Sequence, residues 1–187
     1  MNRNSRMKLV SGLLLSFLAA VVILGPATVS AQDVAVGQAT ATVLTALTVT
    51  APQDLQFGDV LQGVPTSVDK TTDLAGGVGA GIFRIAGSAS NQVSAYMQLP
   101  DYISLADGSD RMVISFSSTD GNYNDAAAAA PSTAGATSFD PHNIPSLTLS
   151  AAGDMALFLG GTVFPTVDQT AGAYSGDIVL TVAYNGN

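Results

Sequence analysis

The stretch that decides the fold is YSGDIVLTVAY, at residues 174–184. Its even positions are mostly apolar: Tyr174, Gly176, Ile178, Leu180, Val182 and Tyr184. Its odd positions are smaller or polar: Ser175, Asp177, Val179, Thr181 and Ala183. Because successive side chains of an extended chain point to opposite faces, this alternation predicts a β-strand with one face on a core.

Weaker strand patterns precede this stretch and are separated by turn residues. The longest covers residues 39–49, where the odd positions are mostly apolar and threonines occupy most of the even ones. Shorter apolar segments recur along the chain, at residues 55–61, 82–85, 93–99, 102–105, 112–116, 147–149 and 155–159. Eight or nine short strands at this spacing predict an all-β fold, an antiparallel β-sandwich.

The composition argues against helices. All fourteen acidic residues are Asp, which favours turns, and Glu, which favours helices, is absent. The run Ala126–Ala130 is too short for a stable helix and is followed by Pro131, so we expect a long surface loop there. We find neither an internal repeat nor a linker, and therefore predict one domain.

The N-terminus has the three parts of a secretory signal peptide. Arg3, Arg6 and Lys8 precede an apolar run at residues 9–24, and small residues close the segment at Val29-Ser30-Ala31. This order predicts cleavage between Ala31 and Gln32, and hence export of the rest of the chain. The apolar run is shorter than the roughly 20 residues that a spanning helix needs. No Cys follows it, which excludes a lipoprotein.

Removal of residues 1–31 leaves a strongly acidic chain. Lys70, Arg84 and Arg111 then face fourteen Asp, so the mature net charge is 3 − 14 = −11. This excess argues against binding to nucleic acid or to an anionic bilayer, since both need clustered basic residues. No later apolar run is long enough to span a membrane, so we expect no membrane insertion after cleavage. Cysteine is absent, so packing, sheet pairing or a partner chain must stabilise the fold.

The sequence offers little for catalysis, and we predict that the protein is not an enzyme and needs no cofactor. His142 is the single histidine, lies in a polar loop, and is not accompanied by a nucleophile-elbow pattern at any Ser. A calcium site is the best small-ligand candidate. Its oxygen ligands would come from one loop: Asp120, Asn122, Asn124 and Asp125. Turn formation explains the same residues.

The segment after the cleavage site differs in phase from the strand pattern that follows it. Val34 and Val36 are at even positions, whereas the apolar face from Ala39 onward is odd, so the phase changes across Gly37-Gln38. One strand cannot keep a single face buried through such a shift. A bulge or a frayed terminus would explain it, and so would a separate N-terminal segment that pairs elsewhere. We therefore divide the chain into a signal peptide (1–31), an N-terminal extension (32–38) that is a possible donor strand, and a β-sandwich domain (39–187).

Three stretches resemble a known family. Residues 54–60, DLQFGDV, resemble the D-L-x-F-G-x-V signature of a small secreted bacterial domain, domain of unknown function 4402. Residues 149–161 resemble its later glycine-containing segment, and residues 172–184 resemble its closing strand. The last strand is also similar to the closing strand of chaperone–usher fimbrial subunits.

The resemblance implies an immunoglobulin-like sandwich, related to pilins and spore-coat-type subunits, that lacks one strand. In those relatives the open groove is filled first by a periplasmic chaperone and then, at the usher, by the N-terminal extension of the next subunit. It implies a homopolymer in the periplasm, at the cell surface or outside a Gram-negative-type bacterium. The expected assembly residues are Val34, Val36, Ala39, Ala41, Val43, Tyr174, Ile178, Leu180, Val182 and Tyr184.

Three functions follow, in order of preference. The first is a structural or adhesive subunit, whose extension joins the next copy or folds back to complete its own domain. The second is a monomeric secreted domain that recognises glycan or calcium through its Asp-rich loops. An exported hydrolase is a distant third.

Overall fold

The computed structural model describes residues 37–126, 129–133 and 137–186. The signal peptide, its cleavage site at Ala31 and Gln32, and Val34 and Val36 lie outside the described residues. The chain divides into two compact units, Met1–Ala41 and Thr42–Asn187. Of the first unit, residues 37–41 are described; they form no regular structure and are exposed.

The second unit is built of strands, which confirms the predicted all-β class. Its described residues contain one short 3₁₀ helix, Pro131–Thr133, and no α-helix. The first strands are β1 (Thr48–Gln53), β2 (Gln56–Phe57), β3 (Thr66–Val68), β4 (Val78–Gly79), β5 (Gly81–Ala86), β6 (Gln92–Gln98) and β7 (Tyr102–Leu105). The others are β8 (Arg111–Ser115), β9 (Gly121–Asn124), β10 (Ser138–Phe139), β11 (Leu147–Thr148), β12 (Asp154–Leu159), β13 (Gly161–Phe164), β14 (Tyr174–Ser175) and β15 (Val179–Tyr184).

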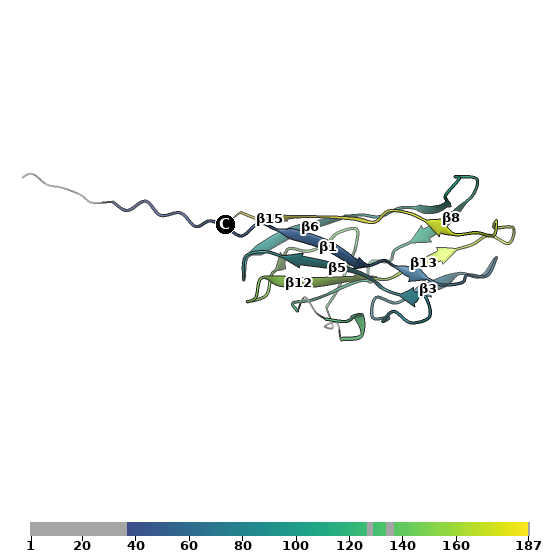
Figure 1. Ribbon diagram of the computed structural model, residues 1–187, viewed down its shortest axis with the longest axis horizontal. Coiled ribbons are helices and arrows are strands. Elements are labelled where there is room, and N and C mark those ends of the chain that lie inside the picture. Colours follow the sequence, from purple (N-terminus) through teal and green to yellow (C-terminus); the bar gives the residue numbers. More distant parts are fainter. Residues whose placement is uncertain (1–36, 127–128, 134–136, 187) are drawn as a thin grey trace, which may run out of the picture. The chain divides into compact units, whose positions relative to one another are not determined.

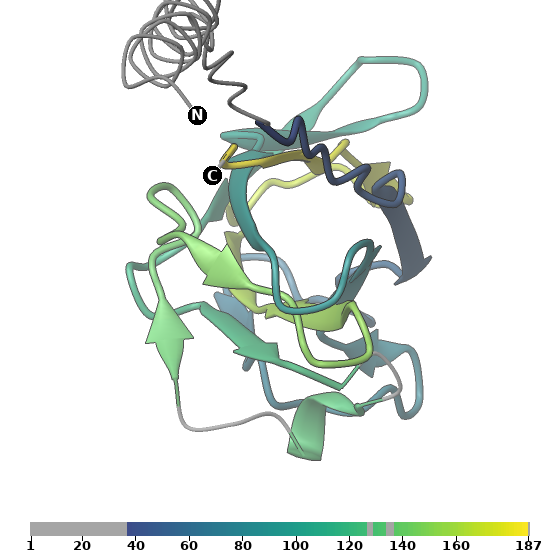
Figure 2. The same ribbon diagram turned by 90° about the vertical axis from the view of Figure 1, so that its left-hand side faces the viewer.

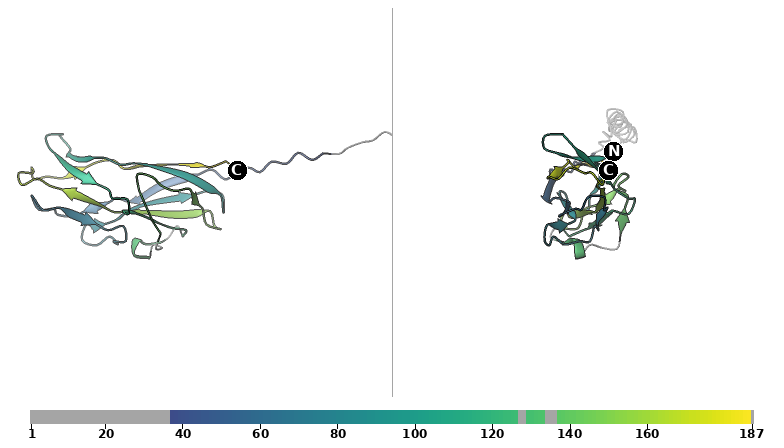
Figure 3. Two further views of the ribbon diagram at one scale, coloured as in Figure 1. Left: turned by 180° about the vertical axis from the view of Figure 1, so that it is seen from behind. Right: turned by 90° about the vertical axis from the view of Figure 1, so that its right-hand side faces the viewer.

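These strands form antiparallel sheets in two halves of the domain. We call the half on the left of Figure 1 the basal half and the half on its right the distal half. The basal half contains the sheet β1-β5-β12-β9-β10 and the sheet β11-β6-β15. The distal half contains the sheet β14-β7-β8-β13-β3, and the small pair β2-β4 accompanies it. Figure 1 shows the basal strands β1, β5, β6, β12 and β15 on the left and the distal strands β3, β8 and β13 on the right. The view from behind in Figure 3 shows the same two halves.

Several chain segments cross from one half to the other. β12 pairs with β5 and β9, and after Gly160 the chain continues as β13, which pairs with β8 and β3. A Cβ atom at Gly160 would lie 2.5 Å from the carbonyl oxygen of Val68, so the crossing requires glycine. In the same way, the C-terminal segment pairs first with β7 as β14 and then with β6 as β15.

A large apolar core lies between the sheets, and a small separate cluster joins Ile82, Ala156 and Phe158. The alternation along the strands brings side chains from both halves into the large core. Its buried members are Phe83, Ile85, Val93, Met97, Met112, Ile114, Phe116, Phe139, Leu147, Leu149, Met155, Leu157, Leu159 and Val163. Figure 2 looks along the domain from its basal end and shows the strands arranged around this centre.

Two predicted strands have different bounds in the structure. The strand expected at residues 39–49 begins only at Thr48, and residues 37–46 are exposed, so their alternation does not reflect burial. The closing strand expected at residues 174–184 is interrupted at Gly176–Ile178, where the chain changes sheet. Its alternation nevertheless holds, because Leu180, Val182 and Tyr184 pack against the core.

Candidate functional site

A large groove opens in the distal half of the domain. It has a volume of about 1260 Å³ and lies between two segments of chain. One wall comes from the end of β1 and the residues after it, Ala51 and Gln53–Val60 with Gln62. The other wall is the continuous segment from Gln169 to Val179. The two walls are far apart in sequence, so tertiary folding creates the groove.

The floor of the groove is the core itself. The groove is lined by Phe83 of β5, Met112 and Ile114 of β8, and Val163 of β13, all of them core residues. Half-buried Ile103 of β7 lies beside them. An extended segment that entered the groove would therefore place its apolar side chains against the core.

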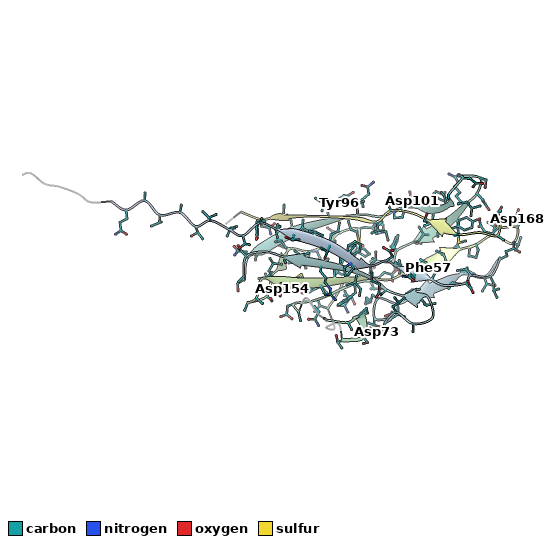
Figure 4. The ribbon with its side chains drawn as sticks, viewed as in Figure 1. Phe57, Asp73, Tyr96, Asp101, Asp154 and Asp168 are labelled. Carbon is teal, nitrogen blue, oxygen red and sulfur yellow. The ribbon has the colours of Figure 1, made fainter. Side chains whose placement is uncertain are left out.

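The first wall is held by backbone geometry and a short strand pair. β2 pairs with β4, so that Gln56 lies opposite Gly79, and Gln53 Nε2 donates to the carbonyl of Ala80 at 2.6 Å. Gly58 has a φ of +68°, a value that favours glycine. The apolar side chains of this wall, Leu55, Phe57 and Val60, are half-buried and pack against the core cluster. Figure 4 labels Phe57 on this wall.

The second wall is held by a carboxylate that lies outside it. Asp110 Oδ2 accepts hydrogen bonds at 2.8 Å from Gln169 Nε2, the Thr170 N–H and the Tyr174 hydroxyl. The Thr170 N–H above all, and then the Tyr174 hydroxyl, hold the pKa of Asp110 well below its ordinary value. Burial raises the pKa of Tyr174, which keeps its hydroxyl protonated as a donor. Asp110 therefore fixes the loop that precedes β14.

Each wall adjoins a strand, β1 or β15, whose outer edge pairs with no other strand among the described residues. β1 pairs with β5 on one side, and β15 pairs with β6 on one side. In the basal half β1 and β15 lie close to each other without pairing (Figure 1). The groove includes only Val179 of β15 and the second half of β1. The edges of β1 and β15 therefore approach each other in the basal half, whereas the space between the two walls is open in the distal half.

A second feature fixes the point where the N-terminal segment leaves the domain. The Tyr184 hydroxyl donates to the carbonyl of Thr45 at 2.7 Å and accepts from the Ser88 N–H at 2.6 Å. The Thr45 N–H in turn donates to Ser88 Oγ at 2.6 Å. Residues before Thr45 are exposed as far as Gly37, whereas Leu47 packs against the core.

The residues expected to take part in assembly fall into three groups. Those of the last strand, Tyr174, Ile178, Leu180, Val182 and Tyr184, are half-buried against the core, and Tyr174 and Ile178 line the groove. Ala39, Ala41 and Val43 are exposed and lie outside the strands. Val34 and Val36 lie outside the described residues.

The proposed calcium ligands serve the turn around β9. Asp120 accepts from the backbone N–H and the hydroxyl of Ser117. Asn124 Oδ1 accepts from the Ala126 N–H, and its amide donates to the carbonyl of Thr133. Asn122 is buried, and Asp125 is exposed. Among the described residues, no group of three or more His, Cys, Asp or Glu side chains converges as metal ligands would.

His142 lies in an exposed turn. Its backbone N–H donates to Asp140 Oδ1, and its Nε2 lies 3.3 Å from the carbonyl oxygen of Phe116. Its described hydrogen bonds thus join it to a turn carboxylate and a backbone carbonyl, which is the arrangement of a loop residue. Within the described part of the chain, no helix is long and apolar enough to cross a membrane.

Sequence reasoning missed Asp110 and Gln169, which hold the second wall of the groove. Asp110 follows an Asp107-Gly108 turn and looks like another turn residue, and Gln169 carries no pattern at all. Gln169 is nevertheless 4% exposed, which is unusual for a glutamine. The motif at residues 54–60 was the available signal, because it forms most of the first wall.

No family model, curated protein or solved structure matches this chain. A function must therefore be argued from the groove, its two walls and the exposed segment that leads into β1.

Proposed function

We propose that this protein is an exported, non-catalytic subunit that forms a homopolymer. Each copy would insert its N-terminal extension into the groove of the next. The observation that carries the proposal is the groove, whose floor is the hydrophobic core and whose walls adjoin β1 and β15. Among the described strands, each of these two pairs on one side only. Such an arrangement suits an added β-strand, which gains backbone hydrogen bonds from an edge and places alternate side chains in the groove.

The order of the strands supports an immunoglobulin-like sandwich that lacks its last strand. In the constant-type fold one sheet has the order A-B-E-D and the other has C-F-G. The basal sheet β1-β5-β12-β9 corresponds to A-B-E-D, and the pair β6-β15 corresponds to C-F. No described strand lies beside β15 in the place of strand G. Because β1 already approaches β15, a donated strand would lie along Gln169–Val179, the segment that leads into β15, in line with the resemblance to pilins.

Because residues 39–44 are exposed and lie outside the strands, the N-terminal extension reaches beyond the expected residues 32–38 as far as Leu44, and it has the properties of a donor strand. With cleavage after Ala31, the free segment before Thr45 runs from Gln32 to Leu44, thirteen residues, and would span about 43 Å when extended. The wall from Gln169 to Val179 has eleven residues, so the two lengths are comparable. From Val34 to Gln53 the chain carries no charge, which suits insertion beside an apolar floor.

The groove also supports the expected need for a chaperone. A monomer in which β1 and β15 each pair on one side only, among the described strands, presents sheet edges that promote aggregation. A periplasmic chaperone that supplies a temporary strand, and an usher that exchanges it for the extension of the next subunit, would solve this problem. Export by the predicted signal peptide would bring the chain to that compartment.

Deletion of residues 32–38 from the secreted protein tests the proposal. We expect the wild type to form oligomers or fibres and the deletion variant to remain monomeric, because its extension no longer fills a groove. Light scattering after size-exclusion chromatography and electron microscopy measure both states. The variant Val34→Ile/Val36→Ile, which keeps the apolar character, serves as the control and should assemble. Unchanged assembly of the deletion variant would refute strand donation.

A further inference from the structure

The distal end of the domain is formed by two turns that are bonded to each other. Leu61–Val64 is one turn, closed by a hydrogen bond from the Val64 N–H to the Leu61 carbonyl. Thr166–Gln169 is the other, closed from the Gln169 N–H to the Thr166 carbonyl. The Gly63 N–H donates to the Thr166 carbonyl at 3.0 Å, and Gln62 Nε2 donates to the Gln169 carbonyl at 2.5 Å. Figure 4 labels Asp168 at this end.

These turns expose three aliphatic side chains, which we call the distal patch: Leu61, Val64 and Val167. Their exposed fractions are 72%, 50% and 83%. The two turns meet at Val167, because a Cβ atom at Gly63, between Leu61 and Val64 in the chain, would lie only 2.9 Å from Val167 Cγ1. Branched aliphatic side chains held in water by rigid turns indicate a contact surface.

The distal patch lies at the end by which a strand would enter the groove. Gln62 and Gln169, which join the two turns, both line the groove. At its other end the groove stops at Ala51 and Val179, where β1 and β15 come close together. An extension that enters at the patch with its N-terminus leading would run antiparallel to the wall Gln169–Val179. Its last residues would then remain at the patch.

The last residues of the extension are themselves apolar and exposed. Val43 and Leu44 have exposed fractions of 93% and 39%. They directly precede Thr45, whose backbone is fixed by Ser88 and Tyr184, so each copy presents them at a defined point. The groove rim carries Asp54, Asp59 and Asp177 and no Lys or Arg. The uncharged residues 34–44 can therefore approach it, whereas the Asp-rich surface of another copy would be repelled.

We propose that the distal patch of one copy binds Val43 and Leu44 of a second copy. This inference rests on the proposed strand donation and specifies its direction: the base of the extension of one subunit meets the distal end of the next. The apolar contact would bury side chains that both copies otherwise expose, and it would hold the inserted strand at the point of entrance.

Because the chain contains no Cys, a disulfide between two introduced cysteines reports this contact without interference from native thiols. In the full-length secreted protein with Val43→Cys and Val167→Cys, we expect mild oxidation to give a ladder of covalent oligomers that reductant dissolves. The matched control is Val43→Cys with Leu74→Cys. Leu74 is also exposed and follows Asp73, which Figure 4 labels well away from Asp168. The control should give at least tenfold less covalent oligomer.

The other outcomes overturn the inference in distinguishable ways. A protein that stays monomeric although it keeps residues 32–38 would mean that the extension does not join copies, which contradicts strand donation as well. Oligomers that depend on residues 32–38 but give no ladder would refute the docking at the distal patch and leave strand donation standing. An equal ladder in the control would show random collision and would also refute it. As a second measurement, Leu61→Ser/Val167→Ser should weaken assembly at least tenfold.

Discussion

At the scale of single residues, the hydroxyl groups of Tyr184 and Ser88 and the carboxylate of Asp110 fix two backbone segments: the one that leads to the N-terminal extension and the one that forms the second wall of the groove. Tyr184 and Ser88 bind the backbone of Thr45, so the chain before it leaves the domain at a fixed point. Asp110 binds the loop that forms the second wall through three donors. Neither role concerns catalysis, and both concern the position of a backbone segment.

Asp110→Asn should destabilise the domain in a pH-dependent way. The ordinary pKa of Asp110 near 3.8 is lowered in the folded state, so its ionised form stabilises the fold. This contribution is present above pH 4 and is lost as the pH falls from there toward the lower folded-state pKa. We therefore expect a lower Tm for the variant at pH 7 and a difference that shrinks below pH 4, measured by circular dichroism. A Tm difference that is constant from pH 7 to pH 2 would contradict this account.

At the scale of elements, the defining feature is the passage of strands from one sheet to another. β12 and β13 are almost continuous, yet they belong to different sheets, and β14 and β15 behave likewise. Glycines at residues 160 and 176 lie at these crossings, where a neighbouring backbone comes close. The crossings let one core serve both halves of the domain, and they bring the core to the floor of the groove.

Gly160→Ala should be strongly destabilising, although the change is small. The new Cβ would lie 2.5 Å from the Val68 carbonyl oxygen and 2.7 Å from the Lys70 nitrogen, both backbone atoms that cannot move away alone. We expect a loss of about 1–3 kcal/mol in the free energy of unfolding, typical of overpacking, measured by urea titration. Gly37→Ala, where nothing lies within 4 Å, is the control and should change little when both variants are compared as monomers. Equal stability of the two variants would contradict the steric explanation.

At the scale of the whole molecule, the groove lies over core residues that are already buried, so an inserted strand would pack on top of them. The basal half is closed by the approach of β1 to β15, and the distal half is left open. No disulfide can compensate, since cysteine is absent from the chain. The free energy of a bound strand would therefore add directly to the stability of the fold.

A synthetic peptide of residues 32–44 should raise the Tm of the variant that lacks residues 32–38. A ligand that binds only the folded state stabilises it by about 2.7 kcal/mol at a hundredfold excess over Kd. Differential scanning fluorimetry measures the shift, and a peptide with Val34→Asp and Val36→Asp is the control. A Tm that the wild-type peptide leaves unchanged at millimolar concentration would exclude the groove as its binding site.

The sequence by itself determined the class of the fold and the faces of its strands. Alternation along residues 174–184 identified Leu180, Val182 and Tyr184 as core-facing, because the side-chain period of a strand is a local property. The same alternation at residues 39–47 was misleading, since Ala and Val alternate with Thr there without being buried.

Only the tertiary structure decided which strands are neighbours, and hence where the groove lies. A period of two says which side of a strand is apolar, but not what lies across from it. The partners of Asp110 are about sixty residues further along the chain, and the two walls of the groove are more than a hundred residues apart. Long-range packing creates such contacts, and no local pattern encodes them.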